Sequence, residues 1–164
     1  MKRLVLLGIA LTSAHAWGQA PNSSSDSQML CAPFVQYAES LLRVIESNEE
    51  RGFIVGNAAE SRRLAAATIA CAEANTRLFS HSEADATLAV VQKQFEVGLA
   101  TSVAVGSARV DVEKAKYCDA AFSFVTSWAE QYTKRMEVGL TGPLDVVPML
   151  AEVETLVPVC GYSN

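Results

Sequence analysis

Four cysteines are the residues of this chain whose type and spacing most directly indicate chemistry: Cys31, Cys71, Cys118 and Cys160. They are separated by 40, 47 and 42 residues, so no two form the short Cys-x-x-Cys pair of a zinc or redox site. In an oxidising compartment, an even number of well-separated cysteines is typical of disulfides. We therefore expect two disulfides and no bound metal.

Residues for catalysis are harder to find. Beyond the first sixteen residues the only histidine is His81, which lies between Ser80 and Ser82. A hydrolytic triad needs a histidine that is oriented by an acid and faces a nucleophile, whereas this pattern is typical of a loop between helices. The chain has no glycine-rich phosphate loop, His-Glu-x-x-His zinc motif or Cys-x-x-Cys-His haem motif. We expect a protein that is not an enzyme and that holds no cofactor.

Acidic pairs and aromatic residues are the remaining candidates for a site. The acidic pairs are Glu49/Glu50, Asp111/Glu113 and Glu152/Glu154. Buried together, such pairs serve acid–base catalysis, but on an acidic protein they are usually solvated. A run of aromatic residues follows, and at helical spacing these are typical of a core: Tyr117, Phe122, Phe124, Trp128 and Tyr132. A ligand pocket between helices is the alternative interpretation of the aromatic group.

The first sixteen residues have the three parts of a secretory signal peptide. Lys2 and Arg3 supply the positive charge, residues 4–11 form an apolar run, and Ala14-His15-Ala16 offers the small residues that signal peptidase accepts. The apolar run falls far short of the ~20 residues of a membrane-spanning helix. We predict cleavage between Ala16 and Trp17 and a periplasmic location, with an extracellular location as the alternative.

The chain that remains after cleavage is acidic. The full sequence has 13 basic and 18 acidic residues and a formal charge of −5, and the loss of Lys2 and Arg3 makes it −7. Nucleic acid or an anionic membrane face would repel such a chain. No later apolar stretch is long enough to span a membrane. We therefore expect a soluble protein whose partner is another envelope or secreted protein.

The rest of the sequence predicts one helical domain over residues 28–164, preceded by a flexible polar segment over 17–27. Apolar residues recur every three or four positions in five segments: 30–45, 57–78, 82–99, 108–138 and 143–157. The alternating segment 102–107 has no partner strand and is interpreted as a helix start or a bend near Gly106. Asn57 with Glu60 and Ser82 with Asp85 have the spacing of capping boxes. The predicted fold is an all-α, antiparallel four- or five-helix bundle.

Helix lengths predict how the cysteines pair. A chain that folds back at Leu140 has Cys118 22 residues before the turn and Cys160 20 residues after it, so their heights differ by about 3 Å. Cys31 and Cys71 are left to pair across the first turn. Around Ile54 their distances are 23 and 17 residues, a mismatch of roughly 9 Å that a kink or a shifted turn has to absorb.

A Val-Gly step recurs at three predicted hairpin turns. The glycines are Gly56, Gly98 and Gly139, spaced 42 and 41 residues apart. A left-handed helix end favours glycine, because residues with a Cβ atom resist that conformation. We therefore expect helical hairpins that turn at these three glycines.

Two of these turns resemble a known element. Residues 95–102 and 136–146 are similar to the Val-Gly-Leu helix–turn–helix element of TolC-type outer-membrane efflux channels. In that family the element forms the periplasmic tip that docks onto an adaptor protein. The chain is less than half as long as a channel protomer and has no barrel strands. The resemblance implies antiparallel helices joined at glycine turns, and a protein partner in the cell envelope.

Together these features favour a protein that works by binding another protein. The first hypothesis is an immunity-type inhibitor of a toxic hydrolase in the periplasm. The second is an accessory subunit of an envelope transport or secretion complex. The third, from a different class, is a carrier that holds a small apolar ligand between its helices.

Overall fold

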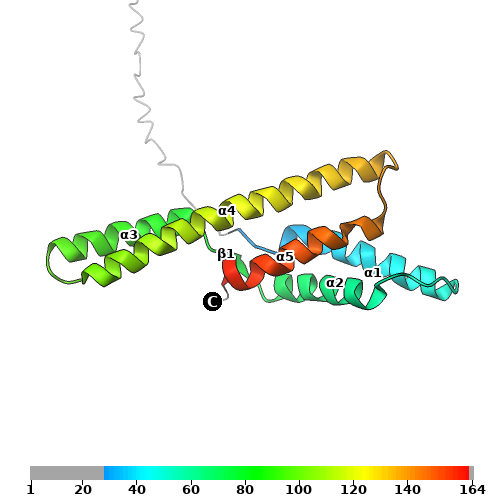
Figure 1. Cartoon of the computed structure of the whole chain (residues 1–164), viewed down its shortest axis with the longest axis horizontal. Coiled ribbons are helices and arrows are strands. Elements are labelled where there is room, and N and C mark those ends of the chain that lie inside the picture. Colours follow the sequence, from blue (N-terminus) through cyan, green and yellow to red (C-terminus); the bar gives the residue numbers. More distant parts are fainter. Residues whose placement is uncertain (1–27, 163–164) are drawn as a thin grey trace, which may run out of the picture.

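The computed structural model describes residues 28–162, and these form a helical protein (Figure 1). The helices are α1 (Val35–Glu50), α2 (Ala58–Glu73), α3 (His81–Glu96), α4 (Ser102–Glu137) and α5 (Val147–Cys160). Short 3₁₀ helices, η1 (Ala32–Phe34) and η2 (Pro143–Val146), precede α1 and α5. Two strands of two residues each, β1 (Arg77–Leu78) and β2 (Gly161–Tyr162), pair antiparallel. The expected all-α bundle is confirmed, and the predicted signal peptide, its cleavage site at Ala16 and Trp17, and segment 17–27 lie outside the described residues.

Helix α4 runs along the whole molecule and belongs to two regions (Figure 1). Its 36 residues correspond to a length of about 54 Å. The second half of α4 packs with α5, and α1 and α2 complete this region, which we call the body (residues 28–78 and 118–162). The first half packs against α3 alone and extends away from the body, and we call this region the hairpin (residues 79–117).

The main hydrophobic core fills the body. Its largest fully buried side chains come from the segment before η1, from η1, from helices α1, α2, α4 and α5, and from β1: Leu30, Phe34, Leu41, Ile45, Leu64, Leu78, Val125, Met149, Leu150 and Leu156. Phe34 packs edge-on against Phe122, with ring centroids 6.2 Å apart. Tyr37 packs edge-on against Tyr132 at 5.7 Å, and its hydroxyl lies 2.7 Å from that of Thr133. Side-chain contacts of these aromatic rings hold η1 and α1 against α4.

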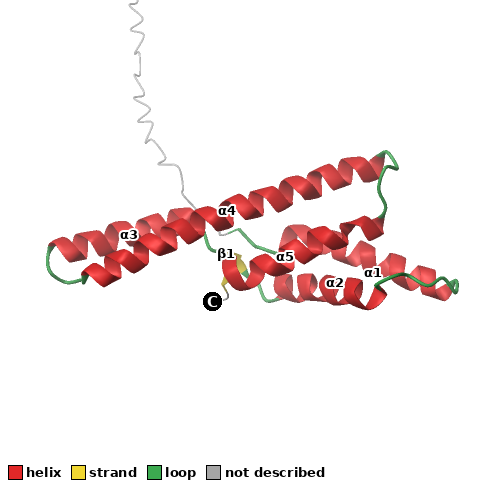
Figure 2. Cartoon of the chain, in the orientation of Figure 1, coloured by secondary structure: helices red, strands yellow, loops and turns green. Residues whose placement is uncertain are grey.

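Both disulfides form with the expected pairing. Cys118–Cys160 has a Cα–Cα distance of 5.4 Å and Cys31–Cys71 one of 5.8 Å. The mismatch expected for the second pair is absorbed because residues 51–57 run back from the end of α1 to the start of α2 (Figure 2). The bridge from Cys118 fastens the midpoint of α4 to the end of α5. Two disulfides indicate that the chain folds in an oxidising environment.

Several local expectations differ from the structure. Helix α1 ends at Glu50 and the chain turns at Gly52, which has the left-handed φ of +78°, whereas Gly56 lies in the return segment without a positive φ. Gly98 and Gly139 do end α3 and α4, at φ +75° and +73°. Residues 102–107 are a helix start, as one of the two interpretations held. Leu78 belongs to β1 rather than to a helix, because its backbone amide donates to the carbonyl of Gln28.

The two predicted capping boxes do not form. Asn57 has a left-handed φ of 59° and its side chain caps nothing, while the carboxylate of Glu60 accepts from Arg63. Helix α3 is capped two residues earlier than the expected Ser82. Its N-cap is Ser80, whose hydroxyl accepts a hydrogen bond from the amide of Glu83.

Candidate binding surfaces

The hairpin has almost no core of its own. Its buried cluster consists of Ala84, Val112 and Ala115, with Phe79 and Leu88 packed against them. From residue 85 to residue 107, a stretch that the structure describes completely, no residue is buried. The outer part of the hairpin is therefore a single layer of two helices with solvent on every other side.

Local hydrogen bonds define both helices of the hairpin. Ser80 caps α3, and the hydroxyl of Thr101 caps α4 by accepting from the amide of Ala104 at 3.2 Å. At the tip, the amide of Leu99 donates to the carbonyl of Gln94 at 2.7 Å, and that of Gly98 to Phe95 at 3.0 Å. This bonding pattern is a Schellman motif, which needs the left-handed backbone that Gly98 provides. The sequence therefore specifies the turn without help from a core.

The tip of the hairpin is apolar and exposed. Phe95, Val97 and Leu99, which we call the tip patch, are 48, 69 and 80% exposed. From Val97 to Ala108 the chain carries no charged residue. Such a surface matches a partner that is itself apolar and uncharged.

A second exposed group lies along α4. Val103, Val110, Tyr117 and Phe124 are 78, 67, 57 and 64% exposed, and we call them the α4 stripe. Tyr117 and Phe124 were expected in the core, and that expectation is wrong. Phe122 is buried as expected, and two residues further along a helix the side chain points about 200° away. Trp128 is partly buried against the core, and Tyr132 is 7% exposed.

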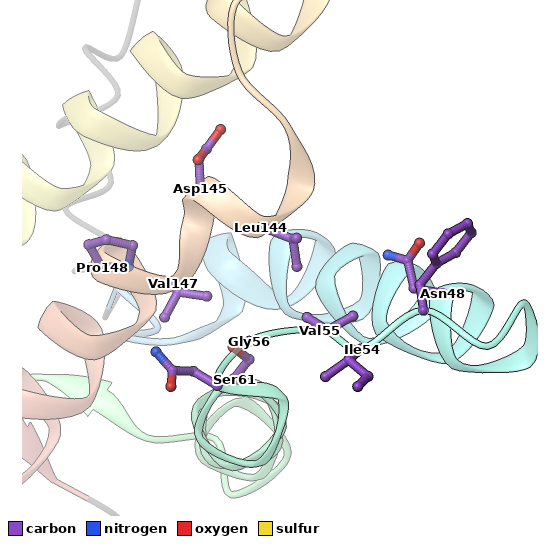
Figure 3. A pocket seen from close by; sticks show the side chains of 11 residues that line it. Asn48, Ile54, Val55, Gly56, Ser61, Leu144, Asp145, Val147 and Pro148 are labelled. Atoms are coloured by element: carbon purple, nitrogen blue, oxygen red, sulfur yellow. The ribbon is translucent and has the colours of Figure 1, made fainter.

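The opposite end of the molecule carries a groove of about 530 Å³ between the α1–α2 connection and η2. Figure 3 shows Leu144 pointing toward Val55 across it, while Asp145 points away. Phe53 and Ile54 lie at its mouth, 62 and 98% exposed. The groove is open to solvent, so the described residues there form a surface cleft rather than an enclosed ligand cavity.

A carboxylate closes the turn beside this groove. Asp145 accepts from the amide of Gly142 at 2.8 Å and from the hydroxyl of Thr141 at 2.7 Å. Both hydrogen bonds favour the charged form and hold the pKa of Asp145 below its usual range. The hydroxyl of Tyr132 donates to the carbonyl of Gly142 at 2.7 Å, and burial raises the pKa of that hydroxyl. The α4–α5 turn is thus fastened to the body.

The base of the hairpin has a hollow of about 530 Å³ where the two regions meet. Phe79 and Tyr162 pack edge-on at 6.5 Å, and the hydroxyl of Tyr162 donates to Glu83 at 3.1 Å. Lys114 places its Nζ 5.3 Å from the centre of the Phe79 ring. These contacts engage Glu83, Lys114 and Tyr162, and they fasten α3 to the carboxyl-terminal strand.

The residues considered for catalysis do not assemble into a site. His81 Nε2 lies 3.2 Å from Asp85 one turn along the same helix, and the hydroxyls of Ser80 and Ser82 lie 2.9 Å apart. The acidic pairs are split among exposed ion pairs: Glu49 with Arg62, Glu113 with Lys116, and Glu154 with Arg63. Arg63 lowers the pKa of Glu154 by hydrogen bonding to it. Within residues 28–162, no three histidine, cysteine or acidic residues are placed to hold a metal.

Comparison with known protein families, with curated proteins and with solved structures finds no match to this chain. The resemblance of two turns to the TolC-type element therefore stays a prediction. None of the described helices combines the length and the apolar character that crossing a membrane requires. The functional argument consequently depends on the surfaces described above.

Proposed function

We propose that this is an exported periplasmic protein that acts without catalysis by binding another protein through its hairpin. The observation that carries this proposal is the absence of any buried residue between positions 85 and 107 of the described hairpin. The body already has a core and two disulfides. The hairpin, which projects and has almost no core, is therefore not needed to stabilise the fold. We infer that its sequence is suited to contact with another molecule.

The physical argument concerns what a two-helix layer lacks. A helix of 16 residues is marginal alone in water, and most helical stability in proteins comes from packing an apolar face. Helix α3 packs one face on α4 and leaves the tip patch in solvent. A partner that covers Phe95, Val97 and Leu99 supplies the missing burial, at about 25 cal/mol for each Å² of apolar surface. The tip patch is therefore the proposed binding centre.

The shape of the tip favours one class of partner. The tip is a glycine turn in which Val97 and Leu99 are exposed. This is the part of the sequence that resembles the docking tip of efflux channels. We therefore propose an accessory subunit of an envelope transport or secretion complex ahead of an immunity-type inhibitor. The carrier hypothesis has the least support, because the two hollows described above are open clefts.

Site-specific photo-crosslinking in cells tests this proposal. A photoreactive amino acid at Leu99 should give one discrete crosslinked envelope protein, and the same probe at Ile54, at the far end, serves as the exposed control. Replacing Val97 and Phe95 by serine in the Leu99 probe strain should abolish that product. A product at Ile54 and none at Leu99 would overturn the proposal. A hydrolase crosslinked to the probe at Leu99 would favour the hypothesis of an immunity-type inhibitor over that of a complex subunit.

A further inference from the structure

We propose that the α4 stripe is the seam of a parallel homodimer, in which α4 of one copy packs against α4 of a second copy. Val103, Val110, Tyr117 and Phe124 follow one another at intervals of seven residues. Each has more than half of its surface exposed. This inference concerns self-association and does not depend on the partner proposed for the tip.

The seven-residue spacing identifies the occupant as a helix. Seven residues are nearly two turns, so each member of the stripe lies about 20° from the previous one and all four share one face. The buried residues Ala108, Ala115, Phe122 and Ala129 follow the same interval on the other side of α4. Helix α4 therefore carries a seven-residue repeat on two faces, a pattern typical of a helix that packs along other helices, and only one of these faces is covered. From Val103 to Phe124 the stripe extends for about 31 Å.

The opposite face of α4 is already occupied. Val112 and Ala115 pack toward α3, and each is two residues from a member of the stripe, Val110 or Tyr117. Two residues along a helix turn the side chain by about 200°. The stripe therefore points away from α3, and no described element covers it. Within residues 28–162, no element has to move for a second helix to reach it.

The residues between the large ones suit a close approach. Gly106, Ser107 and Ala120 occupy intervening positions toward the two ends of the stripe, and Glu113 and Lys114 occupy the equivalent positions in its middle. Small residues let two helix backbones come within packing distance while the larger side chains fill the gaps between layers. At the body end, Phe124 packs on the ring of Trp128 at 6.1 Å, which extends the apolar surface.

The exposed area is adequate for a dimer of two copies. The four side chains of the stripe together expose roughly 500 Å². A specific interface typically buries about 800 Å² on each partner. The remaining area has to come from the small residues and the aliphatic stems that flank the stripe.

Charge selects the parallel orientation. Glu113 and Lys114 lie on opposite flanks of the stripe, between Val110 and Tyr117, because consecutive residues are about 100° apart. When two copies run parallel about a twofold axis along α4, the Glu113 flank of one meets the Lys114 flank of the other, twice. When they run antiparallel in the same register, glutamate faces glutamate and lysine faces lysine. The existing partners, Lys116 for Glu113 and the Phe79 ring for Lys114, are exposed and weak enough to be shared.

A parallel dimer also has a functional consequence. Both hairpins then project from the same end, and the two tip patches lie side by side. Two linked binding elements raise the effective concentration of the second contact, so a repeated or oligomeric partner is held more tightly than one tip would hold it.

Sedimentation equilibrium of the exported chain tests the dimer. At ~100 µM we expect a mass twice that of the monomer, in the concentration range typical of an interface of this size. Tyr117→Glu places a charge in the seam and should give a monomer, while Val90→Glu, on an exposed position of α3 outside the stripe, should leave the dimer intact. Circular dichroism checks that both variants are folded. A wild-type chain that is monomeric at this concentration would overturn the proposal, as would a Tyr117→Glu variant that stays dimeric.

Cysteine crosslinking tests the orientation. In a parallel dimer, Val110→Cys lies opposite its own copy and should oxidise to a covalent dimer on a non-reducing gel. Ser123→Cys is exposed on α4 but outside the stripe, and should not crosslink. A dimer that crosslinks between Val103→Cys and Phe124→Cys chains, and not through Val110→Cys, would overturn the parallel arrangement.

Discussion

The body and the hairpin share helix α4 but are held together in different ways. The core cluster of the body contains 21 buried residues, and that of the hairpin contains three. Both disulfides lie in the body, and Cys118 marks the point on α4 where one region passes into the other. Because α4 is continuous, the difference between the regions cannot come from the helix itself and has to come from what packs against it.

The helix ends show the same contrast. Helices α1, α2 and α5 of the body begin without a side-chain cap, whereas α3 and α4 begin with the caps Ser80 and Thr101. Tertiary packing and disulfides order the body helices, so local signals matter less there. The hairpin has little tertiary packing, and local hydrogen bonds define its geometry. A shape that is set locally and projects from a rigid base is suited to making contacts with another molecule.

Matched leucine truncations should give the largest difference between the regions. Leu150 is fully buried in α5, and Leu88 is partly buried in the hairpin. Leu150→Ala should lower the free energy of unfolding by about 3 kcal/mol, because it leaves a cavity in a close-packed core. Leu88→Ala should cost about 1 kcal/mol, because the site is open and loses only part of its apolar burial. Urea unfolding followed by circular dichroism measures both, and equal losses would show that the two regions form one cooperative core.

Much of the body follows from the sequence, and the reason is geometric. Helical rise per residue is fixed, so counting from the turn at Leu140 was enough to pair Cys118 with Cys160. The Cys31–Cys71 pair required an element that periodicity does not reveal, the extended return of residues 51–57. The Val-Gly step predicts a turn at Gly56, but the chain reverses at Gly52, where the helical hydrogen bonds stop.

The isolation of the hairpin does not follow from the sequence. Leu88, Val91 and Phe95 have the spacing of any core-facing helix, and the pattern does not tell whether that face meets a full core or one neighbouring helix. Tyr117 and Phe124 were expected inside for the same reason, since an aromatic residue at helical spacing is usually buried. The interval of seven residues that joins them to Val103 and Val110 does not set them apart either, because the buried series through Phe122 has the same interval.

Substitution by alanine should change the stability of the hairpin in opposite directions at two of its glycines. Nothing lies within 4 Å of a Cβ atom built on Gly98 or on Gly106, so backbone conformation alone decides the effect. Gly98→Ala should destabilise the hairpin by about 1 kcal/mol, because its φ of +75° is left-handed. Gly106→Ala, inside α4, should stabilise it by about 0.5–1 kcal/mol.

Hydrogen exchange of the amides between residues 85 and 107 measures this effect. The hairpin opens locally, so the change should appear there and leave the protection of amides in α5 unaltered. Protection that changes equally in both regions would mean that the hairpin unfolds only together with the body. The glycine pair therefore tests the separateness of the two regions independently of any core substitution.

The two glycine turns that flank α4 should differ in their sensitivity to acid. The turn after Gly139 is fastened by Asp145, whereas residues 97–108 at the other turn contain no titratable side chain. Because folding lowers the pKa of Asp145, its charge stabilises the fold above the unfolded pKa of about 3.9, and this contribution is lost as the pH falls through the lower, folded value.

Asp145→Asn keeps an acceptor oxygen but removes the charge. The variant should therefore melt below the wild type at pH 6, and the gap should close toward pH 2. Glu60 and Glu154, whose pKa values are also lowered, are present in both proteins and cancel in the comparison. A gap that is constant with pH would assign the effect to geometry rather than to charge, and a parallel loss of protection at residues 97–101 would show that acid loosens both turns through the body they share.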